Sequence, residues 1–317
     1  MSEARGVRSA EDEHASPAAS AYLTVKQAAE VLHVNQKKLY ALIQDGGLPA
    51  TKASGKWLVP RKLLDEWMLE QAHGGVLTDR LLIGGSDDPL LASAVTLLAS
   101  EIRDAALVAI CPTGTRLGLE LLAGRRINVC AIHWGVAESS RTAHVQLVAG
   151  FPGSREWAIV RMGLREQGIV LARERAGVRS LAELARPDVR WASRQEGAGT
   201  QHFVRLMLRE QGIPPEALRS EQTAYSERHA AALVAQGQAD CAPGVRSAAG
   251  EFGLAFLPLG WEAFDLVVPR AVFFRSLFQR LLDLLRSERL RVVAASLKGY
   301  DLTQLGQLVA GADDAPR

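Results

Sequence analysis

Three segments of this chain repeat one plan: an apolar run, a short loop rich in glycine and hydroxyl residues, and then a helical pattern. The loops are residues 85–87, 113–115 and 197–200. Strands that alternate with helices predict an α/β fold with parallel strands. Loops at the carboxyl ends of such strands converge on one crevice, and helix N-termini offer free N–H groups there. The plan therefore predicts an α/β fold from about residue 80 onward, with a site for an anion or polar ligand at the loops.

A different pattern precedes it, from Tyr22 to Met68. Thr24 is expected to cap a first short helix and Asn35 a second, which a glycine pair ends. Two short extended runs around Ser54 predict a hairpin, and a last helix is expected from about residue 61 to 71. The order helix, turn, helix, wing, helix predicts a winged helix-turn-helix.

In such a module the second helix enters the major groove of DNA, where Asn, Gln and Lys side chains read bases or hold phosphates. The wing tip carries further lysines. Solvated lysines are the competing interpretation, and Trp57 is expected to pack the wing on the core. The residues expected to contact DNA are Asn35, Gln36, Lys37, Lys38, Tyr40, Lys52 and Lys56.

Composition limits the class of protein. The chain has 317 residues, 48% of them hydrophobic, and a net charge of only +2, so any nucleic-acid contact must come from a local patch. The first 21 residues contain no apolar signal-peptide core and are expected to be a disordered lead. No stretch approaches the ~20 apolar residues of a membrane span. Three scattered cysteines fit a reducing compartment, and we expect a cytoplasmic protein that contacts no membrane.

The N-terminal segment resembles the excisionase-type (MerR-like) winged helix-turn-helix family. Members of that family bind DNA, and some bind protein partners. The doubled glycine at 46–47 departs from the single glycine usual there. The matching pieces are Tyr22-Leu23-Thr24, Ala28-Ala29, Tyr40-Ala41-Leu42-Ile43, Gly47-Leu48-Pro49, Trp57 and Trp67.

The larger segment resembles the periplasmic-binding-protein-like domain in its type II, bilobed form, and more narrowly its cytoplasmic, molybdate-binding-related subfamily. The matching pieces are residues 85–89, 132–133, 165–168, 194–200, 235–240 and 265–270. The resemblance implies a winged helix-turn-helix domain at 22–73 and a bilobed domain at 80–317. Its lobes would be about 80–160 with 265–317, and about 168–260. The chain would cross between them near 161–167, where we expect two broken strands, and near 264–269.

Several residues of the predicted crevice carry two interpretations. The hydroxyls of Ser86, Thr113, Thr115 and Thr200 either bind ligand or cap helices, and Arg194 either grips an anion or forms a surface ion pair. Asp87 either accepts an N–H of an organic ligand or caps its own helix, and Tyr225 either closes over the ligand or packs. The expected ligand-binding residues are Ser86, Asp87, Thr113, Gly114, Thr115, Arg194, Gln195, Gly199, Thr200 and Tyr225.

Motifs for catalysis are lacking in the sequence, since it has no nucleophile elbow, P-loop or HExxH. Its histidines lack metal-ligand spacing, so we expect neither a cofactor nor a metal, with His133 structural. Arg116 is expected in a surface ion pair, and Cys111 as a small hydrophobe.

We therefore expect a cytoplasmic, ligand-responsive transcriptional regulator, not an enzyme. Its partners would be double-stranded operator DNA, an anionic small-molecule effector and a second copy of itself, in a homodimer or higher homo-oligomer. Resemblance implies molybdate, tungstate, a molybdenum-cofactor-related compound or a small organic anion. One alternative is a cytoplasmic oxyanion or metallo-cofactor carrier whose helix-turn-helix binds a protein; another is an enzyme.

Overall fold

The computed structural model describes residues 21–53, 55–73 and 80–310, with the backbone alone for 69–73. The chain divides into two compact units, residues 1–77 and 78–317, and each is described by itself. The expected disordered lead lies, apart from residue 21, outside the described residues, as does Ser54 at the tip of the expected hairpin.

The smaller unit contains helices and strands in the order that its sequence predicts, with one added strand at the start. Its three strands form an antiparallel sheet in the order β1-β3-β2, so the chain entering the unit pairs with the wing. The elements are β1 (Tyr22–Thr24), α1 (Val25–Val31), α2 (Gln36–Gln44), β2 (Thr51–Ala53), β3 (Lys56–Pro60) and α3 (Arg61–His73).

Local hydrogen bonds explain where these helices begin and end. Thr24 accepts from the backbone N–H of Gln27, whose side chain bonds back to Thr24 in a capping box. Asn35 caps α2 by accepting from Lys38 N at 2.7 Å. Gly46, at φ +67°, supplies the left-handed residue just after α2. Both expected caps are therefore confirmed, and Trp57 packs partly on the core as expected.

The larger unit is built on one sheet that contains ten strands among the described residues, in the order β5-β4-β6-β11-β7-β10-β8-β9, with β12 and β13 also paired to β7. The strands are β4 (Arg80–Gly85), β5 (Leu107–Pro112), β6 (Val129–Ile132), β7 (Trp157–Leu171), β8 (Arg190–Arg194), β9 (Arg219–Ala224), β10 (Cys241–Val245), β11 (Ala255–Pro269), β12 (Tyr300–Asp301) and β13 (Leu308–Ala310). The helices are α4 (Pro89–Ile102), α5 (Thr115–Ala123), α6 (Ser140–Ala149), α7 (Leu181–Leu184), α8 (Gly199–Glu210), α9 (Glu227–Ala235), α10 (Arg246–Glu251), α11 (Arg270–Phe273), α12 (Ser276–Arg286) and α13 (Glu288–Leu297).

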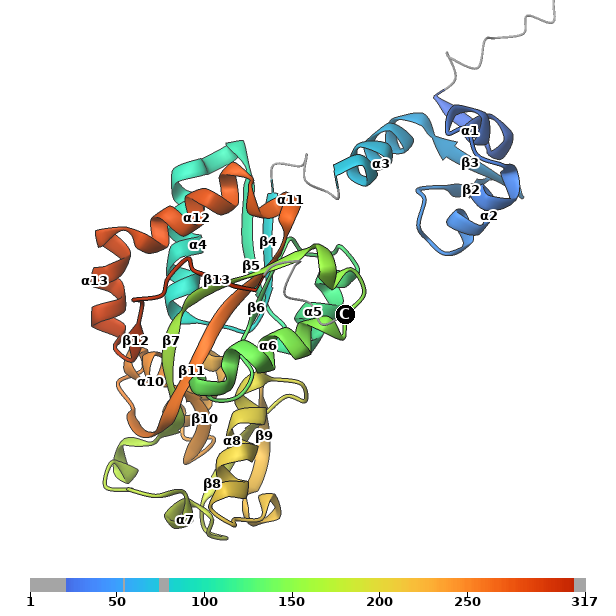
Figure 1. The fold of residues 1–317 in the computed structure, drawn as a ribbon. Helices are drawn as coiled ribbons and strands as arrows, with labels where there is room; N and C mark the ends of the chain where they lie inside the picture. Colours follow the sequence, from blue (N-terminus) through green and yellow to red (C-terminus); the bar gives the residue numbers. More distant parts are fainter. Residues whose placement is uncertain (1–20, 54, 74–79, 311–317) are drawn as a thin grey trace, which may run out of the picture. The chain divides into compact units, whose positions relative to one another are not determined.

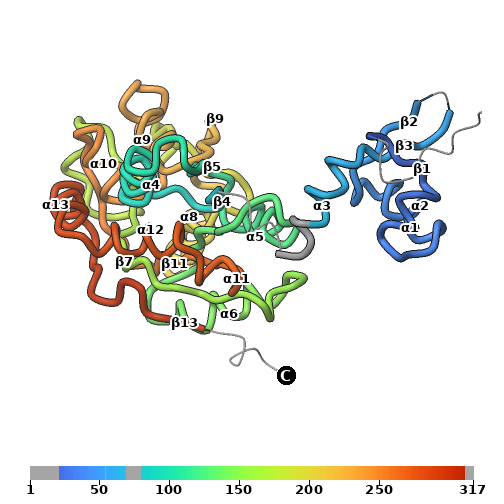
Figure 2. The backbone as a smooth tube through the Cα atoms, turned by 90° about the horizontal axis from the view of Figure 1, so that it is seen from above, coloured from blue at the N-terminus to red at the C-terminus, as the bar shows by residue number. Residues whose placement is uncertain are grey.

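The two ends of this sheet have separate cores. We call β4, β5 and β6 with their helices the first half, and β8, β9 and β10 with theirs the second half. In the first half, α12 and α13 pack on α4, although α4 precedes them in the chain by well over a hundred residues (Figure 1, Figure 2). In the second half, α7 and α8 cover one face of the sheet and α9 and α10 the other. Strands alternate with helices in both halves, which confirms the predicted α/β class.

Two 15-residue strands, β7 and β11, join the halves and pair antiparallel along almost their whole length. The sequence predicted two strands broken near 163–167, and this was wrong. Gly163 faces Phe264 and Arg161 faces Asp265, so Met162 is an extra residue in a β-bulge. A bulge shifts the alternation of side chains without ending the strand, and β7 continues through the polar residues Arg165, Glu166 and Gln167.

Among the described residues, no helix is both long and apolar enough to cross a membrane.

Candidate functional site

Charged and polar side chains fill the space where the two halves of the larger unit meet. None of them is more than 6% exposed, although most can ionise. Buried charges are tolerated only when they are paired and hydrogen-bonded, so each of them needs partners. We call this set the central cluster: Asp87, Asp88, His133, Arg165, Gln167, Arg194, Thr200, Glu227 and Glu262.

Arg165, Glu262 and His133 form the base of the cluster. Arg165 Nε donates to Glu262 Oε1 at 2.6 Å, and His133 Nδ1 lies 2.6 Å from Glu262 Oε2. Burial lowers the pKa of His133, so the imidazole is neutral and donates from Nδ1. Burial would raise the pKa of Glu262, but His133 and Arg165 outweigh it and hold that pKa below its usual range. Glu262 is therefore a carboxylate held between two donors.

Arg165 also joins the ribbon of β7 and β11 to the start of α4. Its Nη1 donates to the Asp87 carbonyl at 2.8 Å and to Asp88 Oδ2 at 3.1 Å. Asp88 accepts from Leu91 N at 2.9 Å, so Asp88, and not Asp87, caps α4. The interpretation that Asp87 caps its own helix is therefore wrong. Burial, with Glu227 nearby, raises the pKa of Asp87.

The second half contributes an arginine, a glutamate and a threonine. Arg194 Nη1 lies 2.8 Å from Glu227 Oε1, which also accepts from Thr200 Oγ1 at 2.6 Å. Glu227 begins α9, where the helix dipole favours an anion. Burial would raise the pKa of Glu227, but Arg194 and Arg165 outweigh it and lower the pKa to about 2. The surface ion pair considered for Arg194 is thus a buried pair.

Several buried side-chain atoms of the central cluster, and one of the neighbouring Gln195, have no hydrogen-bond partner. On the donor side these are Arg165 Nη2 and both Nε and Nη1 of Arg194, since the contact of Nη1 with Glu227 has the distance but not the geometry of a hydrogen bond. On the acceptor side they are Gln195 Oε1 and Glu227 Oε2. Arg165 Nη2 is 3.8 Å from Glu227 Oε1, so an arginine of the joining strand β7 and an arginine of the second half meet at one carboxylate. Leaving such groups unpaired costs ~1–3 kcal/mol each, which a ligand with both donors and acceptors would recover.

Two of the predicted hydroxyls lie beside the cluster and a third does not. Ser86 Oγ and Thr115 Oγ1 are 2.9 Å apart, and Thr115 Oγ1 also lies 3.2 Å from the His133 carbonyl. Thr113 Oγ1 accepts from Gly85 N at 3.0 Å and stabilises the loop that ends β4. Neither Ser86 nor Thr115 caps a helix; their hydroxyls bond to each other and to the His133 carbonyl.

The predicted glycines mark the closest approach of the two halves. A Cβ atom on Gly199 would stand 2.2 Å from the His133 carbonyl oxygen. A Cβ atom on Gly114, at φ +80°, would stand 3.2 Å from Gln195 Nε2. Real Cβ atoms do not approach a carbonyl oxygen so closely, so Gly199 is needed for the halves to meet in this way.

Aromatic rings also cross between the halves. Trp134 stacks on His202 with ring centroids 4.2 Å apart, and the Arg116 guanidinium lies 5.0 Å from the Trp134 ring. Arg116 therefore contacts an aromatic ring instead of a surface carboxylate. Tyr225 is 62% exposed and stacks on His229, so it packs and does not cover the cluster.

The sequence did not single out Asp88, Arg165, Gln167, Glu227 or Glu262 as ligand-site residues, and it placed His133 among structural histidines. A signal was available for two of them. Arg165 and Glu262 lie in the middle of long apolar strands, where a charge needs a buried partner. No local motif marks Glu227, because its role depends on the position of α9 in the fold.

In the smaller unit, the residues predicted to contact DNA are all exposed. Tyr40 is 42% exposed. Asn35 uses its Oδ1 atom in the cap of α2, and Lys52 Nζ lies 6.0 Å from the Trp57 ring centroid. Lys37 and Lys38 are the cations of α2, and both are exposed.

Within the described part of the chain, no group of three or more His, Cys, Asp or Glu side chains is arranged to hold a metal ion.

The family comparisons agree with this architecture. The PBP superfamily domain model matches residues 99–286, more than half of the chain, and the chain belongs to that superfamily. A helix-turn-helix domain model matches residues 22–72. Together they confirm the predicted fold class, a helix-turn-helix unit followed by a periplasmic-binding-protein-like domain.

Individual relatives are distant. The chain is 21% identical over 309 residues to the uncharacterised protein YvgK of Bacillus subtilis, covering 90% of this chain and 97% of YvgK. The solved structure of OxyR from Corynebacterium glutamicum is 18% identical, with a TM-score of 0.49 over 86% of this chain and 89% of OxyR. A putative phosphate transporter substrate-binding protein from Clostridium perfringens is 12% identical, with a TM-score of 0.48 over 71% of this chain and all of that one.

The substitution Gly199→Ala tests the close approach of the halves. The added Cβ atom would meet the His133 carbonyl, so the variant should lose roughly 1–3 kcal/mol of unfolding free energy. Gly177→Ala is the matched control, because a Cβ atom there meets nothing within 4 Å, and it should stay within about 0.5 kcal/mol of the parent. Calorimetric unfolding measures both. Equal stability of the two variants would contradict the observed contact.

The acid limb of the stability curve tests the charge of Glu227. The pKa of Glu227 in the folded protein, about 2, lies below its ordinary value of 4.5. The ionised carboxylate therefore stabilises the folded state fully above pH 4.5, and this contribution is lost as pH falls toward 2. Two and a half pKa units correspond to roughly 3 kcal/mol. Glu227→Gln should be less stable at pH 7 and should lose less stability between pH 4.5 and 2. Parallel pH profiles for parent and variant, measured by urea unfolding, would show that Glu227 is not ionised in this way.

Proposed function

We propose that this protein is a ligand-responsive, DNA-binding transcriptional regulator. The observation that carries the proposal is the convergence at Glu227 of unpartnered donors and acceptors from the joining strand β7 and from the second half, in a chain that also contains a helix-turn-helix unit. A ligand that bonds to both halves stabilises their closed arrangement and shifts the population toward it.

In this proposal the two sheet halves are the lobes expected from the sequence, about 80–160 with 265–317 and about 168–260. The ligand contacts Arg165 from the joining strands together with Arg194, Gln195 and Glu227 from the second lobe. Ser86 and Thr115 supply hydroxyls from the first lobe. In this proposal the protein binds its effector without turning it over.

The charges of the cluster favour one class of ligand among those that resemblance suggests. Two arginines face four carboxyl groups, of Asp87, Asp88, Glu227 and Glu262, and His133 is neutral. A bare dianion such as molybdate would meet like charges in this site, and such contacts are costly. An organic ligand with N–H donors and an acceptor matches both sets of unpartnered atoms. A molybdenum-cofactor-related pterin or a small organic anion carrying N–H groups therefore fits better than the oxyanion alone.

The smaller unit would act as an excisionase-type (MerR-like) winged helix-turn-helix. We propose that α2 enters the major groove, that Gln36, Lys37 and Lys38 contact bases or phosphates, and that Lys52 and Lys56 hold phosphates from the wing. One short recognition helix buries little surface on DNA, so two copies of the chain would bind paired half-sites. Because its partner is DNA, the protein would work in the cytoplasm.

DNA binding is tested by a gel shift with the protein's own upstream DNA. The double substitution Lys37→Ala/Lys38→Ala removes two cations, so affinity should fall at least about tenfold and the slope of log K against log salt should decrease by about 2. The exposed pair Arg186→Ala/Arg219→Ala in the larger unit is the control and should bind like the parent. Equal binding by both double variants would favour the carrier alternative, in which the helix-turn-helix binds a protein.

Ligand binding is tested by thermal unfolding with pterin, sodium molybdate, sodium tungstate and citrate. A compound at 100 times its Kd should stabilise the parent by about 2.7 kcal/mol. Arg194→Ala should abolish this shift, whereas Arg205→Ala, an arginine on the exposed side of α8, should retain it. Equal shifts in the two variants would place the ligand elsewhere. Stabilisation by molybdate but not by pterin would overturn the ligand class and leave the regulator proposal intact.

A further inference from the structure

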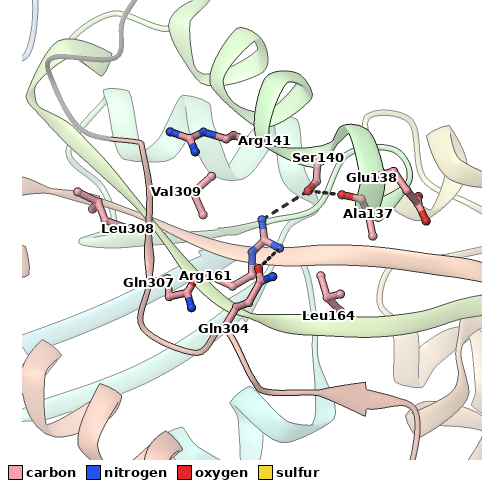
Figure 3. Close-up of a pocket in the computed structure, with 10 residues that line it drawn as sticks. All are labelled: Ala137, Glu138, Ser140, Arg141, Arg161, Leu164, Gln304, Gln307, Leu308 and Val309. Atoms are coloured by element: carbon pink, nitrogen blue, oxygen red, sulfur yellow. Dashed lines mark hydrogen bonds between the residues drawn. The ribbon is translucent and has the colours of Figure 1, made fainter.

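A hollow lies on the first half, away from the central cluster. It has a volume of about 390 Å³ and lies between the start of α6, strand β7 and the segment that leads into β13 (Figure 3). We call it the outer pocket and define it by Ser140, Arg141, Arg161, Gln304, Gln307 and Leu308. Its size falls within the range typical of small-molecule sites.

The outer pocket has a buried arginine at its base. The Arg161 side chain is only 7% exposed, and its Nε donates to Asp265 Oδ1 at 2.5 Å. Asp265 Oδ2 lies 2.6 Å from His144 Nδ1, and His144 Nε2 accepts from Trp134 N at 2.9 Å. Because Nε2 accepts, the proton of the hydrogen bond to Asp265 is on Nδ1, which donates. Arg161 is thus held in place from behind, through its Nε atom.

The two outer nitrogens of Arg161 are weakly engaged. Nη1 lies 3.4 Å from Gln304 Oε1 and Nη2 lies 3.4 Å from Ser140 Oγ, at the far limit of hydrogen bonding. Figure 3 shows the guanidinium between these two side chains, in the midst of the residues that line the pocket. The guanidinium is anchored at Nε, and only these two long hydrogen bonds hold its Nη atoms, so both Nη atoms can turn to a stronger acceptor in the pocket.

The bulge at Met162 explains why this arginine does not belong to the central cluster. Arg165 pairs with Glu262 and Arg161 with Asp265 across the same two strands. Glu262 and Asp265 are three residues apart, so they point to opposite faces of β11, and the bulge gives the two arginines the same relation on β7. Each face of the ribbon thus carries a triad of arginine, carboxylate and histidine.

The lining indicates the chemistry of the occupant. Arg141 is exposed beside the pocket and forms no ion pair among the described residues, while Leu164 and Leu308 provide an apolar wall. Asp265 already balances part of the charge of Arg161, and Glu138 lies on the rim at the far side from Arg141 (Figure 3). One negative charge is therefore accommodated better than two.

We propose that the outer pocket binds a small organic monocarboxylate, with its carboxylate between the Arg161 fork and Arg141 and its apolar part against Leu164 and Leu308. A planar carboxylate matches the two Nη donors of a guanidinium, and the glutamine amides border the same space. This site is separate from the proposed effector site, so its failure would leave the regulator proposal untouched.

Calorimetric titration of the full chain with benzoate, benzamide and phenyl phosphate tests the proposal. Benzoate should bind, benzamide should bind at least about tenfold more weakly because it lacks the charge, and the phosphate dianion should bind no tighter than benzoate. Arg141→Ala should weaken benzoate binding several-fold. Arg155→Ala is the control, since Arg155 is an exposed arginine of the first half that does not line the pocket, and it should bind like the parent.

Two further variants locate the bound carboxylate. Arg161→Lys keeps the charge but loses the fork, so benzoate affinity should fall while circular dichroism shows a folded protein. Arg194→Ala alters the central cluster alone and should leave benzoate binding unchanged. The proposal is overturned if benzoate does not bind at millimolar concentration, if benzoate and benzamide bind equally, if Arg141→Ala binds like Arg155→Ala, or if Arg194→Ala abolishes binding.

Discussion

The buried ion pair between Arg165 and Glu262 is the interaction on which the arrangement of the larger unit depends. It joins β7 to β11 where these strands pass from one half of the sheet to the other. Arg165 also bonds to the Asp87 carbonyl and to Asp88 at the start of α4, so one guanidinium holds the joining strands and the first half together. Removing one partner of such a pair costs about 3–5 kcal/mol, because the other is left as an unpaired buried charge.

The Arg165 side chain that joins these strands also offers a contact for a ligand. Arg165 uses its Nε and Nη1 atoms for structure and keeps Nη2 unpartnered, 3.8 Å from a carboxylate of the second half. Structural and ligand-binding roles are thus divided among atoms of one side chain. A ligand that bonds to Nη2 and to Arg194 would sense whether the halves are together, since those atoms belong to different parts of the sheet.

Sequence patterns predicted the smaller unit in more detail than the larger one. Its helix caps at Thr24 and Asn35 and its hairpin follow from side chains a few residues apart, and local hydrogen bonds fix them. The α/β class of the larger unit also followed from its alternating pattern. The central cluster did not, because Glu262 is paired with Arg165 across 97 residues by strand register, and Glu227 reaches Arg194 through the packing of α9. The break expected near 163–167 was also wrong, because β7 runs on past the bulge at Met162 and pairs with β11 on both sides of it.

The bulge at Met162 also decides to which face of the ribbon Arg161 and Arg165 point. In a regular strand without the bulge, Arg161 and Arg165, which are four residues apart, would point to the same face of the ribbon, while Glu262 and Asp265 would still point to opposite faces. One arginine would then lack its carboxylate, and a buried unpaired charge would result. With it, two similar triads are formed back to back, and Trp134 N bonds to the histidine of one while the adjacent His133 belongs to the other. The peptide unit between His133 and Trp134 therefore lies between the two triads and gives the two faces of the ribbon a short physical connection.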